Sequence, residues 1–402
     1  MIPAEGYEAF LLDLDGVVYR GEEAVPGAPE ALARLRAAGR SVIFLTNNSA
    51  RTPDQIVDKL SGLGVQARPE EVVTSAHALA ALVAAPDGDR TAYVIGEDGV
   101  REALGAAGVE VVEGQPDRAG YVVVGWDRDL TYEDLRIASV LVGRGATLMA
   151  TNADASYPAE GGELWPGAGA ILAAVETATG ASAEVAGKPY RPLFETALER
   201  AGSRRAAVIG DRIETDIAGA RAAGLDGILV WTGASGPADL LDNDALPSAT
   251  MMDLGDLFAD RPSPRIVAAD PGDLDRIGGL LRAAGLGLDE TSEADGTVVA
   301  MEGAEVLATA SVEVEGPEGY LRSVAVTERV RGAGLGALVS AAAARDAARR
   351  GARRLFLVTE GAERFFGRLG FESLDRDSLP AWVRERSTGC SETSTAMTRP
   401  VA

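Results

Sequence analysis

The chain has 402 residues, of which 46% are hydrophobic and 25% charged, and its formal net charge is −23. The length predicts two or three domains with ample core. The negative charge argues against nucleic acid or an anionic membrane as a partner, because a surface that tracks phosphates needs an excess of Lys and Arg. A single cysteine, Cys390, excludes a disulfide framework or a thiolate zinc site, and a single histidine, His77, excludes a histidine metal cluster.

The N-terminal residues include Glu5 and Glu8 and no basic region before an apolar run, so we expect no signal peptide. No run of about 18 apolar residues occurs, so we expect no membrane span. The cytoplasm is therefore the expected location, and the acidic composition is compatible with a monomer or a homo-oligomer. We expect His77, which precedes Ala78 and Leu79, to be structural.

The first strong signal is the apolar run Phe10-Leu11-Leu12, which leads into Asp13 and Asp15 and then Gly16. Such a run is typical of a buried strand, and on a regular strand the two carboxylates would point the same way. Two like charges so close are costly without a cation or a shared proton, so the pair indicates a Mg²⁺ site, an acid/base pair, or both. The alternative is an Asx turn that merely ends the strand.

Strand and helix signals alternate over the first third of the chain. A helix is predicted over residues 26–39, a strand over 41–45, and a second helix from 51 to 62 or 64. This alternation predicts a parallel sheet, in which Thr46 lies at the same edge as Asp13. The Thr46 hydroxyl and the amides that follow it would suit a phosphate oxygen, or would form an ordinary capping turn.

A second series of strands is predicted over residues 92–96, 121–126 and 146–150. We interpret residues 78–181 as an insertion that covers the first sheet. Turn-rich stretches within it, at 151–154 and 166–170, would reach a small ligand or serve as ordinary loops.

The first sheet then resumes with further polar residues at strand ends. Lys188 lies between a glycine and a proline, ahead of a helix predicted over residues 192–201. The buried strand predicted over 206–210 ends in Asp211, and Asp216 follows five residues later. Carboxylates, a threonine and a lysine at neighbouring strand ends are hard to explain as unrelated caps.

Together these motifs resemble those of the haloacid dehalogenase superfamily of phosphatases. In chain order they are Asp13-x-Asp15-Gly16, Thr46-Asn47-Asn48, Gly187-Lys188-Pro189 and Gly210-Asp211-Arg212-x-x-Thr215-Asp216. With Gly125-Trp126-Asp127 and Thr151-Asn152-x-Asp154, the spacing is most similar to the branch with a large α/β (type C2) cap. That branch includes glycerol-phosphate, phosphoglycolate, nucleotide-type and p-nitrophenyl phosphatases.

The resemblance covers residues 5–258 and implies an α/β fold. A Rossmann-like core with a parallel sheet would comprise residues 1–77 and 182–258, and residues 78–181 would form the substrate-specificity cap. It also implies catalytic roles for two residues: Asp13 would be the nucleophile that forms an aspartyl-phosphate, and Asp15 would be the general acid and base.

The resemblance further implies two sets of binding residues. Mg²⁺ would lie on Asp13, the backbone carbonyl of Asp15 and Asp211, with Asp216 in support. The phosphoryl oxygens would be held by Thr46, Asn47, Asn48 and Lys188.

A linker is predicted at residues 259–264, because prolines at 262 and 264 prevent a continuing helix. Residues 265–402 then mix strand and helix signals around the glycine loop at 331–336. One interpretation is a Rossmann fingerprint, but the predicted sheet is too small for a dinucleotide. A second is a flexible helix N-terminus, and a third is a loop whose amides face a pyrophosphate.

With Leu369-Gly370-Phe371, the third interpretation resembles the α+β fold of GCN5-related N-acetyltransferases (GNAT). The resemblance implies acetyl-CoA as a second cofactor. The residues that it implies for acyl-CoA binding are Val324, Val326, Arg331, Gly332, Gly334 and Gly336. One departure is Phe366, where the family often has a tyrosine that serves as an acid toward the CoA thiolate. The domain is therefore expected to be catalytic or regulatory, and Cys390 to be packed.

The predicted function is Mg²⁺-dependent hydrolysis of a small phosphorylated metabolite, with glycerol 3-phosphate as the first candidate. The alternative substrates are phosphoglycolate and nucleoside monophosphates. A different alternative is a protein with a vestigial phosphatase that senses an acyl-CoA or an amino acid, or that acts as an N-acetyltransferase.

Overall fold

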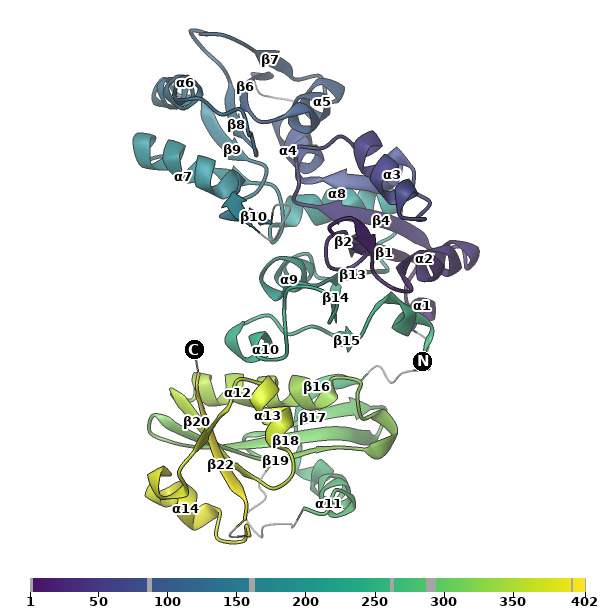
Figure 1. Ribbon diagram of the computed structural model, residues 1–402, viewed down its shortest axis with the longest axis vertical. Helices are drawn as coiled ribbons and strands as arrows, with labels where there is room; N and C mark the ends of the chain where they lie inside the picture. The colour runs from purple at the N-terminus through teal and green to yellow at the C-terminus, as the bar shows by residue number, and fades with distance from the viewer. Residues whose placement is uncertain are drawn as a thin grey trace.

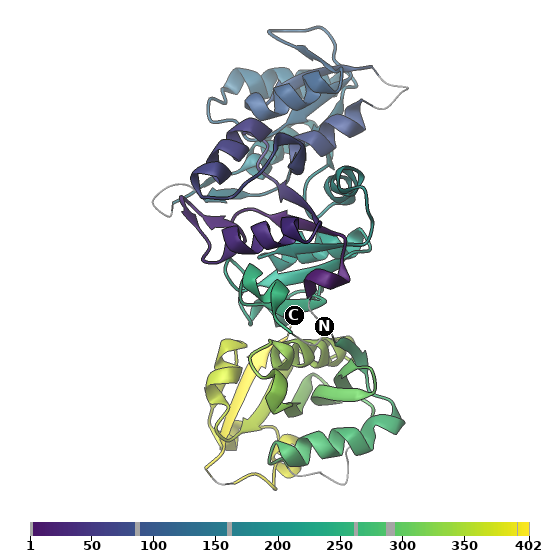
Figure 2. The same ribbon diagram turned by 90° about the vertical axis from the view of Figure 1, so that its right-hand side faces the viewer.

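The computed structural model describes residues 3–84, 89–158, 163–260, 264–286, 294–391 and 393–401. Three large sheets follow one another along the long axis of the molecule, and both ribbon views agree on this order (Figures 1 and 2). We call the sheets with their helices the core, the cap and the C-terminal domain; the cap lies at one end and the core in the middle. Residues 261–263 of the predicted linker lie outside the described residues.

The core is built on a six-stranded parallel sheet in the order β15-β14-β13-β1-β4-β5. Its strands are β1 (Ala9–Asp13), β4 (Ser41–Thr46), β5 (Val72–Thr74), β13 (Ala206–Gly210), β14 (Asp226–Val230) and β15 (Ala249–Met251). Its helices are α1 (Pro3–Gly6), α2 (Ala28–Ala37), α3 (Pro53–Gly62), α4 (Ser75–Val83), α8 (Arg191–Ala201), α9 (Ala218–Ala222) and α10 (Asp239–Asp242). A short hairpin, β2 (Tyr19–Arg20) and β3 (Glu23–Ala24), follows β1.

Strand β1 lies at the centre of this sheet because apolar residues occupy both of its faces. Leu11 packs into the apolar cluster on one side of the sheet, and Phe10 and Leu12 pack into the cluster on the other. All three are fully buried. Since β1 pairs in parallel with both β4 and β13, its carboxyl end lies between theirs.

The cap contains a five-stranded parallel sheet in the order β12-β9-β8-β6-β7. Its elements are β6 (Thr91–Ile95), α5 (Asp98–Ala106), β7 (Glu110–Val112), β8 (Tyr121–Val124), α6 (Tyr132–Gly143), β9 (Thr147–Ala150), the hairpin β10 (Ser156–Pro158) with β11 (Leu164–Pro166), α7 (Ala168–Thr179) and β12 (Glu184–Val185). Strand β12 lies beyond residue 181, where the sequence analysis ends the insertion. The domain boundaries at 77/78 and 181/182 stay proposals.

The C-terminal domain has a seven-stranded sheet in the order β16-β17-β18-β19-β20-β22-β21. Its elements are β16 (Arg265–Ala268), α11 (Leu274–Ala283), β17 (Thr297–Glu302), β18 (Glu305–Glu315), β19 (Glu318–Val326), α12 (Leu335–Arg349), β20 (Arg354–Thr359), α13 (Glu363–Arg368), β21 (Glu372–Leu374), α14 (Ala381–Arg386) and β22 (Thr395–Pro400). All neighbours are antiparallel except β19 and β20, which pair in parallel only over Glu318–Tyr320. Beyond Tyr320, the edge of β19 that faces β20 has no strand partner in the described sheet. These three sheets confirm the predicted α/β and α+β architecture.

One apolar cluster is shared by the core and the C-terminal domain. Leu240 and Leu241 of α10 belong to the same buried cluster as Leu338 and Ala341 of α12, and α10 lies directly above α12 in Figure 1. The two units are therefore packed together as well as tethered. Within the described ranges, no helix has the length and apolar character that a membrane span requires.

Candidate active site

The predicted site residues gather at the carboxyl ends of the core strands, facing the cap. A cavity of about 610 Å³ lies there between the two units. Its lining includes all but one of the residues predicted for catalysis, phosphate binding and metal binding in the core: Asp13, Asp15, Thr46, Asn47, Asn48, Lys188 and Asp211. The exception is Asp216, which lies behind the lining and is fully buried.

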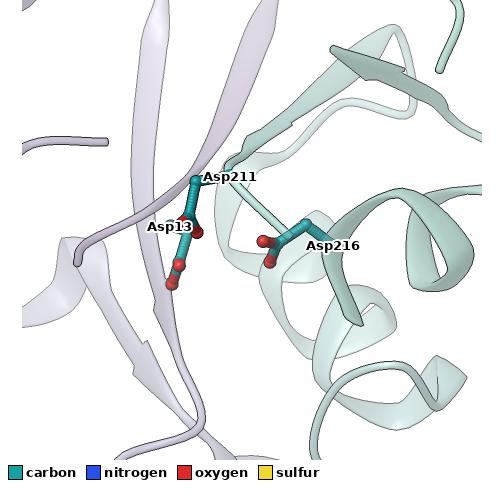
Figure 3. Close-up of side chains that lie close together, drawn as sticks. All are labelled: Asp13, Asp211 and Asp216. Atoms are coloured by element: carbon teal, nitrogen blue, oxygen red, sulfur yellow. The ribbon is translucent and has the colours of Figure 1, made fainter. Parts of the chain in front are cut away.

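Three carboxylates converge on one point of this cavity. Asp13 ends β1, Asp211 follows β13, and Asp216 lies in a π-helical turn, Ile213–Ile217. One oxygen of each lies within 4.8 Å of the others, and Figure 3 draws the three side chains. The backbone amide of Arg212 donates to Asp216 Oδ2 at 3.0 Å and fixes that carboxylate. The structure therefore brings together side chains that the sequence places some 200 residues apart.

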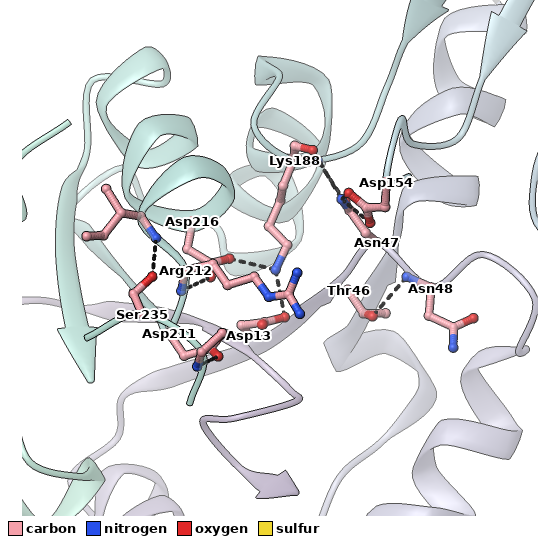
Figure 4. A network of polar contacts seen from close by, with 12 residues as sticks. Asp13, Thr46, Asn47, Asn48, Asp154, Lys188, Asp211, Arg212, Asp216 and Ser235 are labelled. Atoms are coloured by element: carbon pink, nitrogen blue, oxygen red, sulfur yellow. Dashed lines mark hydrogen bonds and ion pairs between the residues drawn. The ribbon is translucent and has the colours of Figure 1, made fainter. Parts of the chain in front are cut away.

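Lys188 is the cation that faces these carboxylates. Its Nζ donates to Asp13 Oδ1 and to Asp216 Oδ1, both at 2.6 Å, and the side chain is almost fully buried (Figure 4). Burial alone would lower the pKa of Lys188, but the attraction of Asp13 and Asp216 raises it above its ordinary value. The lysine is therefore held in its charged form.

The pKa of Asp13 is raised as well. Burial raises the pKa of Asp13 to about 8, and the negative charges of Asp216 and Asp211 add to the rise, while Lys188 opposes it. One ammonium faces three carboxyl groups, so full ionisation of the cluster leaves an excess of negative charge. Such an excess favours the binding of a cation.

The surroundings of the Asp211 carboxylate show whether a hard cation such as Mg²⁺ fits this site. Its Oδ2 accepts a hydrogen bond from the Ala234 amide at 2.6 Å, whereas its buried Oδ1 has no hydrogen-bond partner. Gly16, at φ 79°, and Gly233 both pack on this carboxylate, and a Cβ at either position would overlap it. A free carboxylate oxygen beside Asp13 matches the oxygen ligands that Mg²⁺ prefers. The residues present therefore fit the metal.

Asn47 ties the predicted phosphate-binding residues to the cap. Its Oδ1 accepts from the Lys188 amide at 2.7 Å, and its Nδ2 donates to the Lys188 carbonyl and to Asp154 Oδ2, each at 3.1 Å. Thr46 Oγ1 accepts from the Asn48 amide at 3.0 Å, so its hydroxyl is held at the cavity. Asn48 uses its own side-chain oxygen to accept from the Ala50 amide, and Figure 4 shows that side chain directed away from Lys188.

Asp15 lies just past the end of β1, with its side chain exposed to the cavity. The protein around it still removes enough solvent to raise its pKa, against the opposing charges of Lys59 and Arg212. A raised pKa suits a group that gives and takes a proton near neutral pH. Tyr19, which lines the same cavity, has its pKa raised by burial and by the charges of Asp15 and Asp13.

Two features of the site had no role predicted from the sequence. Asp154 reaches in from the cap to accept from Asn47, and burial raises its pKa; its signal was the Thr151-Asn152-x-Asp154 motif. The turn after β14 also contributes, since Thr232 Oγ1 donates to the Gly16 carbonyl at 2.6 Å and the Ala234 amide holds Asp211. The only feature of the sequence that indicated this turn was a glycine after a buried strand.

The cap wall of the cavity carries an aromatic pair. The rings of Trp126 and Tyr157 stack with centroids 4.2 Å apart, and Trp126 Nε1 donates to the Pro166 carbonyl at 2.9 Å. Arg128 lies over the Trp126 ring, 5.3 Å from its centroid. This packing gives the cavity a fixed, partly apolar wall on the cap.

A second cavity, of about 1470 Å³, opens in the C-terminal domain. Its lining includes all six residues predicted for acyl-CoA binding: Val324, Val326, Arg331, Gly332, Gly334 and Gly336. Phe366 also lines it and packs edge-on against Phe365 and Phe371. Cys390 is partly exposed at this cavity, where the sequence analysis expected a packed residue.

The family models that match the chain follow the same division. A haloacid dehalogenase-like hydrolase model matches residues 10–110, and a further hydrolase model of the same type matches 185–257. A model of the acetyltransferase (GNAT) family matches residues 271–371. Among curated proteins, an acid sugar phosphatase from Staphylococcus aureus (strain USA300) is 38% identical over 256 residues, which are 63% of this chain and 98% of that protein.

Two solved structures show how far the similarity extends. Glycerol phosphate phosphatase from Mycobacterium tuberculosis, in complex with magnesium, is 29% identical with a TM-score of 0.69, and the match covers 92% of this chain and 98% of that one. A 4-nitrophenylphosphatase from Thermotoga maritima is 33% identical with a TM-score of 0.59, covering 63% of this chain and 97% of that one. The first similarity therefore includes most of the C-terminal domain.

Proposed function

Since the chain belongs to the haloacid dehalogenase-like hydrolase family and is a phosphatase of that family, we propose that it is a Mg²⁺-dependent hydrolase of a small polyol or sugar phosphate, with glycerol 3-phosphate as the first candidate. The observation that carries the proposal is the pairing of Asp13 with Lys188 beside the unpartnered oxygen of Asp211. The similarity to a glycerol phosphate phosphatase over 92% of the chain supports the choice of substrate.

In the proposed reaction, a carboxylate oxygen of Asp13 attacks phosphorus while the ester P–O bond breaks. Asp15 gives its proton to the leaving alkoxide, which departs as an alcohol. Asp15 then takes a proton from water, whose oxygen attacks the phosphorus of the aspartyl-phosphate and releases inorganic phosphate from Asp13. The raised pKa of Asp15 supports this double role.

The remaining residues hold the phosphoryl group. Lys188, fixed by Asn47 and by its own ion pairs, supplies positive charge beside Asp13, and the Thr46 hydroxyl lies at the same cavity. Asp13, the Asp15 carbonyl and Asp211 would hold Mg²⁺, which when bound would neutralise charge between the nucleophile and the phosphate. Asp216 supports the site through Lys188 and the Arg212 amide.

The cap excludes water and selects the leaving group in this proposal. Asp154 and the wall formed by Trp126 and Tyr157 face the core across the cavity. A polar carboxylate beside a flat aromatic wall suits a polyol or sugar, which has hydroxyl groups on an otherwise apolar carbon frame.

For the C-terminal domain we propose acyl-CoA binding. Its match to the acetyltransferase model and the glycine loop at the start of α12 support this. Phe366 has no hydroxyl and packs between Phe365 and Phe371, so this position supplies no proton for acetyl transfer.

The test is phosphate release from glycerol 3-phosphate, phosphoglycolate, a nucleoside monophosphate, a sugar phosphate and p-nitrophenyl phosphate, with Mg²⁺ or with EDTA. We expect glycerol 3-phosphate to have the highest kcat/KM, and turnover to require Mg²⁺. Asp13→Asn should abolish it, and Asp377→Asn, which changes an exposed carboxylate in the C-terminal domain, should not. Metal-independent turnover, or an active Asp13→Asn variant, would overturn the proposal; a different preferred ester would overturn only the substrate.

A further inference from the structure

The phosphatase cavity and the groove of the C-terminal domain meet at one turn of the core. This turn, residues 231–237, follows β14. Gly233 and Ala234 line both cavities, and the turn thus forms a wall shared by two binding sites. A ligand in either cavity would touch the same short piece of backbone.

On the phosphatase side, the turn fixes a residue predicted to hold the metal. The Ala234 amide donates to Asp211 Oδ2 at 2.6 Å, and the Ser235 amide donates to the Asp211 carbonyl at 3.0 Å. Ser235 Oγ accepts from the buried Ile213 amide at 3.1 Å. The orientation of the Asp211 carboxylate therefore depends on the conformation of the turn.

On the other side, core residues complete the groove. Trp231, Pro237 and Met252 line it together with residues of the C-terminal domain. Thr250 Oγ1 of β15 donates to the Ala333 carbonyl at 3.2 Å, so the glycine loop contacts the edge strand of the core. The groove is therefore a composite of both units.

The chemistry of the groove selects its occupant. Where β19 parts from β20 it presents an unpaired strand edge, which suits the amides of a pantetheine arm. Gly334, whose backbone is in the left-handed region, is the N-cap of the 15-residue helix α12, and Arg331 lines the groove nearby. Together the helix N-terminus and the arginine suit a pyrophosphate. The volume of about 1470 Å³ suits a ligand as long as a nucleotide-linked thioester.

We infer that the turn at residues 231–237 couples the two sites, so that an acyl-CoA in the composite groove orders the turn and tightens the hold of Asp211 on Mg²⁺. This inference rests on the proposed function, in which Asp211 is a metal ligand. A ligand that orders a shared wall lowers the entropic cost of the second binding event, and thermodynamic linkage makes the coupling reciprocal. Mg²⁺ in the phosphatase site must then tighten acyl-CoA binding by the same factor.

Calorimetric titration of acetyl-CoA into the full chain, with Mg²⁺ and with EDTA, measures the coupling without any turnover. We expect acetyl-CoA to bind at least about 5-fold more tightly with Mg²⁺. In the Asp211→Asn variant the two affinities should be equal, which separates coupling through the site from Mg²⁺ bound to the coenzyme itself. Equal affinities in the wild type, or no binding of acetyl-CoA at millimolar concentration, would overturn the inference.

Substitutions in the wall of the groove show which residues contribute to acetyl-CoA binding. Trp231→Ala or Met252→Ala, each made in the phosphatase core, should weaken acetyl-CoA binding several-fold; if both folded variants bind as the wild type does, the core wall is not part of the site. Arg331→Glu should weaken it as well, and Arg353→Glu, the same change at an exposed position outside the groove, should not. Coupled binding in a protein that hydrolyses no ester would sustain this inference and overturn the proposed function, so the two failures are distinguishable.

Discussion

Lys188 and Asp13, 175 residues apart in the chain, form an ion pair of 2.6 Å between the lysine Nζ and a carboxylate oxygen of the predicted nucleophile. The same nitrogen lies 2.6 Å from Asp216 Oδ1. The lysine therefore holds in one arrangement a carboxylate at the end of β1 and a carboxylate in the π-helical turn after β13. Charge balance at this point governs both the stability of the site and its reactivity.

Replacing this lysine by an uncharged side chain of similar length should destabilise the fold. In Lys188→Met, Asp13 and Asp216 lose their common partner, and the loss of one partner of a buried ion pair costs roughly 3–5 kcal/mol. The folded-state pKa of Asp13, already raised by burial, then rises further, so the folded state binds more protons than the unfolded chain above pH of about 4. The destabilisation should be largest at neutral pH and shrink toward pH 4, as urea unfolding in EDTA would measure.

The double variant Lys188→Met/Asp216→Asn serves as the control, because it removes one negative charge together with the positive one. Its stability should recover most of the loss, while its phosphatase activity should not recover. Equal stability of Lys188→Met and the wild type at pH 7 would show that the cluster does not depend on the lysine charge.

Asn47→Leu should uncouple Lys188 and Asp154 from one another. The leucine is branched at the same carbon but makes none of the hydrogen bonds of the amide, so the Lys188 amide, the Lys188 carbonyl and the Asp154 carboxylate each lose a partner. We expect a loss of at least about 2 kcal/mol in unfolding free energy and a raised KM. Asp154→Asn keeps one acceptor and should cost less; a wild-type KM in both variants would contradict the role of this contact.

The single histidine allows a direct test of local burial. His77 Nδ1 accepts from the Thr74 amide at 3.2 Å, and burial, with the nearby charge of Arg200, lowers the His77 pKa to about 4. Protonation therefore favours the unfolded chain, and stability present above pH of about 6.5 is lost as pH falls toward 4, by roughly 1–3 kcal/mol. An NMR titration of the His77 imidazole measures this pKa directly. A midpoint near 6.5 would contradict the buried environment of His77.

Arg345→Met should weaken the junction between the core and the C-terminal domain. The guanidinium donates from α12 to the carbonyls of Asn243, Leu240 and Ala245 at the end of α10. Its loss leaves these acceptors without the guanidinium, at a cost of roughly 1–3 kcal/mol, and should split thermal unfolding toward two transitions. Arg349→Met changes an exposed residue of the same helix and should leave the calorimetric profile unchanged; an unchanged profile for both would contradict the role of Arg345.

The sequence predicts the core well where local pattern and fold agree. The apolar run before Asp13 predicts a buried strand, and that strand is the central one of the sheet. Parallel pairing then brings Thr46 and Asp211 to the same edge without further information. Asp15, by contrast, falls past the end of β1, so strand periodicity does not fix its side chain.

The sequence does not predict contacts between units that pack against each other through their surfaces. Nothing around Thr250 indicates that its hydroxyl binds the carbonyl of Ala333, 83 residues later. The stacking of Trp126 on Tyr157 likewise depends on how a hairpin of the cap folds back. Such contacts follow from the shapes of assembled sheets, and a one-dimensional pattern does not encode them.

The proposed mechanism requires that Asp13 carries the phosphoryl group during turnover. Its most direct test is to mix the enzyme with Mg²⁺ and ³²P-labelled glycerol 3-phosphate, quench in acid within milliseconds, and map the labelled peptide. We expect a base-labile label on the peptide that contains Asp13, and no label in Asp13→Asn. Turnover of the ester with an unlabelled protein, or with label on another residue, would contradict it.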